Sequence, residues 1–262
     1  MRSRISWQLA ITVVAAMATT GAWAQVGGPA DVVEMPLVKA FVPAMGFDDN
    51  DPNVQMILTG YLPNACYRLT ETQTQRDSEG KPVWVAQKAE IIRNGVCAEQ
   101  GDLPAHLLEV VPFTTVVSLG RLPVGEYAVS YLKRETMNSA TTDGVRRFSV
   151  VQALVPTVDN IKYANLTSVV VRPVSTVGEN IQAVLSGMLT SACTDLAPEV
   201  RVTRVDDVVV VLPGISLRES PFCTLVLRPF ERAINLGSFA ANTYLVHARS
   251  MGGQAVNSVF TV

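Results

Sequence analysis

The sequence predicts an all-β protein built from two tandem β-sandwich domains, each closed by one internal disulfide. Three observations support this prediction: a stretch that occurs twice, a cysteine motif that occurs twice, and a composition rich in Val, Thr and Ser with few aromatic residues. β-branched residues are enriched in strands. A chain of 262 residues is long enough for two such domains, each with its own core.

The first 24 residues have the pattern of a secretory signal peptide. Arg2 and Arg4 precede an apolar run, and Ala22-Trp23-Ala24 supplies the small-x-small pattern of a signal-peptidase site. We expect cleavage after Ala24 and export to the periplasm or the extracellular space, with an uncleaved anchor as the alternative. No later apolar run is long enough for a membrane span, so none is expected in the mature chain.

Removing this leader takes away two of the 21 basic residues and none of the 23 acidic ones, so the mature chain is mildly acidic. Proteins that bind nucleic acid usually present a basic face. No such face is visible here, and we expect no nucleic-acid partner.

The repeated stretch is LGRLPVGEYAV at Leu119–Val129, which returns as LGSFAANTYLV at Leu236–Val246. In the first copy Gly120, Pro123 and Gly125 interrupt the chain before Tyr127 enters an alternating, strand-like segment. The second copy keeps Tyr244 but has Asn242 where the first has Gly125, and Asn tolerates a positive φ next best after Gly. A tyrosine in this position has the form of the tyrosine corner of immunoglobulin-like sandwiches, whose hydroxyl bonds back to the preceding connection.

The four cysteines follow the same repeat. Cys66 lies in GYLPNACYRL and Cys193 in GMLTSACTDL, and each is followed about 30 residues later by another cysteine, Cys97 or Cys223. We therefore predict the disulfides Cys66–Cys97 and Cys193–Cys223. Free buried thiols or a metal site are the alternatives, but neither spacing is CxxC and the chain has only two histidines.

The repeat places one domain at residues 25–152 and the other at 153–262, with a linker at Val151–Pro156. Strands are expected at Pro82–Ile92 and Val208–Leu212. The second of these is apolar throughout, which a central buried strand explains more simply than an edge strand waiting for a partner.

The largest difference between the two copies is an insertion, AEQGDLPAHLL, at Ala98–Leu108. Insertions between matched strands fall in loops, and loops often carry binding function. This candidate binding loop would contact a partner through polar and apolar side chains: Glu99, Asp102, Leu103, His106 and Leu107. Drift in a tolerant surface turn is the simpler alternative.

The order GxLPxxCxxL, a second Cys, PF and then LGxLPxGxYxV resembles a module of secreted bacterial proteins with repeated immunoglobulin-like domains, mostly of unassigned function. The resemblance covers both halves of the mature chain and is closer in the first copy. It implies export and a β-sandwich fold, and it carries no catalytic residues.

The sequence contains no GxSxG, HExxH, Walker loop or GxGxxG in a strand-to-helix setting. The two histidines, His106 and His247, are expected to be surface or packing residues. The acidic run Asp48–Asp51 offers oxygen ligands for Ca²⁺, but such runs are usually solvated turns, and we expect neither a metal site nor a cofactor.

These observations favour an exported, non-enzymatic binding or structural protein that acts through contacts with a protein or a glycan. A protease inhibitor that inserts the Asp102–Ala105 loop into a cleft is one alternative. An enzyme without a recognisable active-site motif is another.

Overall fold

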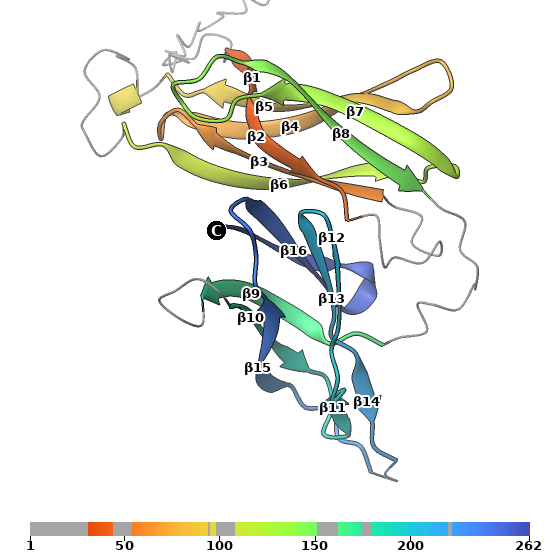
Figure 1. Ribbon diagram of the computed structural model, residues 1–262. Helices are drawn as coiled ribbons and strands as arrows, with labels where there is room; N and C mark the ends of the chain where they lie inside the picture. Colours follow the sequence, from red (N-terminus) through yellow and green to blue (C-terminus); the bar gives the residue numbers. More distant parts are fainter. Residues whose placement is uncertain are drawn as a thin grey trace, which may run out of the picture.

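The computed structural model in Figure 1 describes residues 31–43, 54–93, 95–97, 108–150, 162–173, 180–219 and 222–262. In these residues the fold is all-β, as the sequence predicts, with strands and two short 3₁₀ turns. No helix among them is long and apolar enough to cross a membrane. We call the described residues up to 150 the first half and those from 162 the second half. The predicted linker lies outside the described residues.

The strands of the first half join into one continuous hydrogen-bonded path, β1-β5-β7-β2-β3-β6, with β4 beside β5 and β8 beside β7. Their bounds are β1 Val32–Met35, β2 Leu37–Phe41, β3 Val54–Leu62, β4 Tyr67–Arg76, β5 Pro82–Ile91, β6 Val111–Gly120, β7 Gly125–Lys133 and β8 Thr142–Val150, and the 3₁₀ turn η1 is Gly95–Cys97.

The second half contains two main sheets, β15-β10-β9 and β12-β13-β16-β17, and the short pair β11-β14. The bounds are β9 Asn165–Pro173, β10 Ile181–Leu189, β11 Thr194–Leu196, β12 Arg201–Val205, β13 Val208–Leu212, β14 Ile215–Leu217, β15 Arg228–Gly237, β16 Thr243–Arg249 and β17 Ala255–Thr261, with the 3₁₀ turn η3 at Met251–Gly253. No strand of one half pairs with a described strand of the other.

The two halves repeat one pattern of strand pairing. The antiparallel pair β3–β6 corresponds to β10–β15, and the run β4-β5-β7-β8 corresponds to β12-β13-β16-β17. In both runs the central contact is parallel, between β5 and β7 and between β13 and β16. Both sheets of an immunoglobulin sandwich are antiparallel, so this central parallel pair is a distinctive feature of the chain.

A glycine and a phenylalanine of the repeated motifs face each other across these matched pairs. Gly60 pairs with Phe113, and Gly187 pairs with Phe230. A Cβ on Gly60 would lie 2.6 Å from the Phe113 ring, and one on Gly187 would lie 2.8 Å from the Phe230 ring. Each ring therefore packs directly over its glycine, and this close approach explains why the two residue types recur together.

The tyrosine corners predicted from the repeat are present in both halves. The Tyr127 hydroxyl donates to the Pro123 carbonyl at 2.6 Å, and the Tyr244 hydroxyl donates to the Ala240 carbonyl at 3.0 Å. Both tyrosines are buried, and each stacks on a phenylalanine near the end of the following strand, Phe148 or Phe260. The corners fix the entry of β7 and β16 into their sheets.

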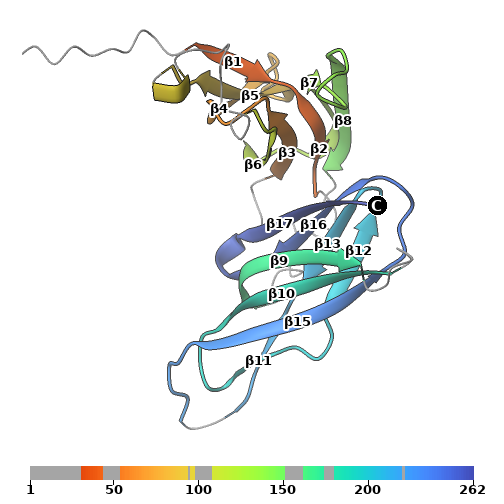
Figure 2. The same ribbon diagram turned by 90° about the vertical axis from the view of Figure 1, so that its left-hand side faces the viewer.

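Each half has its own apolar core, and a third cluster joins the halves. In β13, Val209 and Val211 point into the core of the second half, while Val208, Val210 and Leu212 point the other way. Those outward side chains pack with Phe41 of β2 and Ile57 of β3, which are fully buried. Figure 2 shows the β2–β3 region beside the sheet that contains β13 and β16. Both faces of β13 are thus covered, which confirms it as a central buried strand.

A charged cluster borders this interface. Asp207, in the turn between β12 and β13, lies 3.0 Å from Lys39 Nζ and 2.9 Å from Arg146 Nη1. The Lys39 ammonium also donates to the Asn242 side chain and to the Thr243 carbonyl. One carboxylate of the second half is therefore shared by two cations of the first. Such an arrangement fixes orientation because a partly buried charge is costly without its partners.

Candidate functional site

Both predicted disulfides are present: Cys66 is bonded to Cys97 and Cys193 to Cys223. The remaining predicted site residues, in the candidate binding loop, lie outside the described residues, and so does the acidic run Asp48–Asp51. The two predicted disulfides are therefore confirmed, and the binding role of the loop Ala98–Leu108 stays a prediction.

The clearest surface feature of the described chain is an apolar strip at the end of the second half that lies farthest from the first half (Figure 1). It consists of Leu217, Phe222, Leu225, Val226 and Leu227, whose exposed fractions are 56%, 86%, 91%, 44% and 66%. Isolated exposed apolar residues are ordinary on protein surfaces, but their concentration in one part of the chain points to an interaction site or an aggregation hazard. We call this group the apolar strip.

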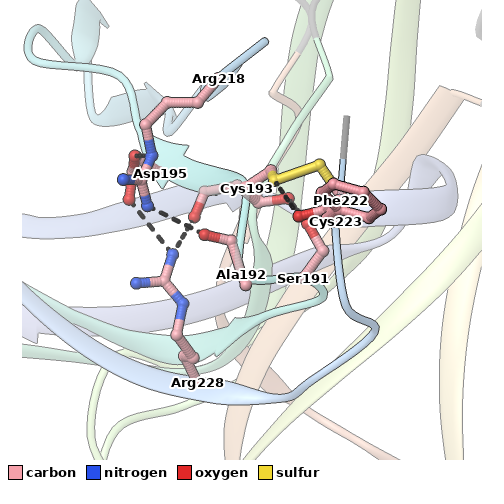
Figure 3. Close-up of a disulfide and its surroundings, with 9 residues drawn as sticks. Ser191, Ala192, Cys193, Asp195, Arg218, Phe222, Cys223 and Arg228 are labelled. Carbon is pink, nitrogen blue, oxygen red and sulfur yellow. Dashed lines mark hydrogen bonds and ion pairs between the residues drawn. A yellow bond between two sulfur atoms is a disulfide. The ribbon is translucent and has the colours of Figure 1, made fainter. Parts of the chain in front are cut away.

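The Cys193–Cys223 disulfide holds the strip in place (Figure 3). Beside it, the Ala192 N–H donates to the Thr224 carbonyl at 3.0 Å, and the Arg218 N–H donates to the Cys193 carbonyl at 2.8 Å. These hydrogen bonds hold Arg218, next to Leu217, and Thr224, within the strip segment, against the chain around Cys193. Residues 222–227 nevertheless belong to no strand. The apolar side chains of the strip are displayed on an anchored backbone.

An ion-pair network lies next to this disulfide. Asp195 accepts from Arg218 Nε at 2.7 Å and from Arg228 Nη2 at 3.1 Å. Arg218 also donates to the Ala192 carbonyl, and Arg228 to the Thr194 carbonyl. Figure 3 shows Arg218 and Arg228 on either side of Asp195. The arginines thus cross-link the strands that support the strip, while the strip itself carries no charge.

The two disulfides differ in their surroundings. Cys66 and Cys97 are both buried and pack with Ile92. Cys193 is buried as well, but its partner Cys223 is exposed. The sulfur of Cys223 therefore lies in a more accessible part of the surface than either sulfur of the first cystine.

A shallow groove of about 630 Å³ begins at the strip. Its lining includes the strip residue Leu217 and three further apolar residues, Val200, Leu212 and Ile215. Three charged residues also line it: Lys162, Glu199 and Arg201. The lining of the groove thus combines apolar and charged residues next to the strip. The groove extends the apolar strip along the second half.

A second cavity, of about 260 Å³, lies at the junction between the halves. Val42, Phe148 and Val208 supply apolar lining, and Arg146 lines it as well. That arginine is already paired with Asp207. Because Arg146 is held in this ion pair, we regard the second cavity as part of the packed junction between the halves. No histidine lines either of the two cavities.

His247 is a packing residue, as the sequence predicts. It lies in β16, is 1% exposed, and its Nδ1 lies 2.7 Å from the Asn257 side-chain oxygen. Burial lowers its pKa from the usual 6.5 to about 4, an effect to which the positive charge of Arg249 adds. The side chain is therefore neutral at pH 7. The described residues contain no group of three or more side chains that could hold a metal ion.

The sequence reasoning missed the apolar strip. The available signal was the segment Phe222–Leu227 itself, in which Phe, Leu and Val dominate and no charge occurs before Arg228. The repeat itself gives no further signal, because its largest difference is the insertion Ala98–Leu108 in the first copy.

Comparisons with known proteins give no relative for this chain: no family model, no curated protein and no solved structure matches it.

Proposed function

We propose that this protein is an exported, non-enzymatic binding or structural protein, made of two immunoglobulin-like β-sandwich domains, that contacts another protein through the apolar strip. Three features support the proposal: the predicted signal peptide, two disulfides of the kind that persist in oxidising compartments, and the strip itself. The periplasm and the extracellular space both satisfy these features.

The observation that carries the binding function is the strip. Leu225 is 91% exposed and Phe222 86% exposed on a backbone anchored by a disulfide. Leaving large apolar side chains in water forgoes about 1.5–3 kcal/mol each relative to burial, so their display by an anchored segment favours a partner that covers them. Leu225, Val226 and Leu227 offer aliphatic carbon and no hydrogen-bonding side chain, which suits an apolar protein surface better than a glycan rich in hydroxyl groups.

The test is a capture experiment from the native envelope and medium. The intact exported protein, the variant Leu225→Lys and the control Val170→Lys would be used as bait. Val170 is an exposed valine of β9 in the same half, so the control adds the same charge away from the strip. We expect Leu225→Lys to lose partners that both the original protein and the control retain. Equal capture by all three baits would refute the strip as the contact surface.

A further inference from the structure

The apolar strip continues an exposed sheet edge. β15 is the outer strand of the sheet β15-β10-β9. Proteins protect such edges with charged residues and proline, because unpaired strand edges recruit other strands. Pro229, Glu231 and Arg232 place these protective residue types along β15. The segment Phe222–Leu227, immediately before β15, has no charged residue and no proline.

This segment follows the same line as β15. Arg228, at the start of β15, pairs with Leu189 of β10, and Thr224 accepts a hydrogen bond from Ala192. Thr224 precedes Arg228 in the chain, and Ala192 follows Leu189 by a nearly equal number of residues. The two segments therefore run side by side in opposite directions, as in an antiparallel pair. The disulfide from Cys193 to Cys223 holds the same alignment one residue further on. The edge therefore extends past the end of the ladder into the apolar strip.

The direction of the backbone groups follows from this alignment. In an extended chain, the N–H and C=O of one residue point to one side and those of the next residue to the other. The Thr224 carbonyl points inward, toward Ala192. In an extended continuation of β15 the backbone groups of Leu225 and Leu227 point outward, and those of Val226 point inward. Leu225–Leu227 lie in no ladder with the described part of the chain.

We propose that the partner contributes an extended, uncharged, apolar strand that pairs with the outward backbone of Leu225 and Leu227. This inference rests on the proposed function and specifies its mode. In strand addition, main-chain hydrogen bonds supply affinity and alternate side chains supply specificity. The partner strand is uncharged because the strip offers no ionic group, and the charged residues of β15 limit the pairing to the segment before Arg228.

The test uses a soluble peptide of about ten alternating Thr and Val residues, the length of a long strand, with the exported protein labelled with ¹⁵N at leucine and valine. Strand addition should slow hydrogen exchange at the Leu225 and Leu227 amides about tenfold or more while leaving Val226 unchanged. The variant Leu225→Lys should bind the peptide about tenfold more weakly, whereas Val170→Lys should bind as the original protein does.

The outcomes separate this inference from the proposed function. Peptide binding that shifts the leucine amide signals without slowing hydrogen exchange at the Leu225 and Leu227 amides would overturn strand addition, although the strip would remain a contact surface. No binding up to about 1 mM, the weak end of specific association, would overturn the proposed partner class. A dimer of this chain that Leu225→Lys dissociates would also overturn it, since the occupant would then be a second copy. The capture experiment tests the strip independently of all three results.

Discussion

His247 is a buried titratable side chain whose protonation is linked to folding. It is 1% exposed, and burial lowers its pKa to about 4. In the unfolded chain the imidazole takes up a proton as the pH falls below about 6.5, whereas in the folded chain it stays neutral down to about 4. Between these values the unfolded state binds more protons, so stability is lost as the pH falls from 6.5 to 4.

We therefore predict that His247→Gln flattens the dependence of the unfolding free energy on pH between 6.5 and 4. A pKa depressed from 6.5 to about 4 corresponds to about 3 kcal/mol over this range. Denaturant unfolding at a series of pH values measures it. His106 and every carboxylate are common to both proteins, so the difference between the two curves isolates His247. Parallel curves would show that His247 is not the group responsible.

At the scale of elements, the two disulfides have the same place in the repeat but different exposure. Cys66 and Cys97 are 2% and 8% exposed, whereas Cys223 lies on the surface beside the apolar strip. Thiol–disulfide exchange requires a thiolate to reach one of the sulfurs. The second disulfide offers that access through Cys223, and the first is shielded at both ends.

Limited treatment of the folded protein with a dithiol should therefore reduce Cys193–Cys223 first, about tenfold faster or more. Alkylation at short times followed by peptide mapping identifies the freed cysteines. The same treatment in denaturant is the control, in which the two disulfides should react at similar rates. Preferential release of Cys66 and Cys97 from the folded protein would contradict the burial difference.

Several elements could be predicted from the sequence because their signals are local. The matched cysteine motifs predict both disulfides, the turn before Tyr127 and Tyr244 predicts both corners, and the apolar run Val208–Leu212 predicts a central strand. In each case the residue type and its spacing determine the local structure.

Other features depend on contacts between distant segments and have no local signal. Nothing in Val208–Leu212 indicates that its partner strand runs parallel, or that β2 and β3 cover its second face. The burial of His247 depends on the same packing. The apolar strip could not be identified from composition alone, because an apolar run without charges in Phe222–Leu227 is equally compatible with a buried strand.

At the scale of the whole molecule, the two halves share no sheet but are packed together. Val208, Val210 and Leu212 of the second half are buried against Phe41 and Ile57 of the first. Asp207, Lys39 and Arg146 add a polar contact at the border. This packing leaves the apolar strip at the far end (Figure 1), so the first half supports the second without covering its proposed contact surface.

We propose that the two halves are separate domains, each with its own core and disulfide, and that they stabilise one another through this interface while the strip stays free. Equilibrium unfolding of residues 157–262 alone, compared with the intact mature chain, tests it most directly. We expect the fragment to unfold cooperatively, because it keeps its core, but with a free energy lower by about 3 kcal/mol, because the outer face of β13 is exposed to water. An unchanged free energy would contradict the stabilising interface, and a fragment without cooperative unfolding would contradict the separate domains.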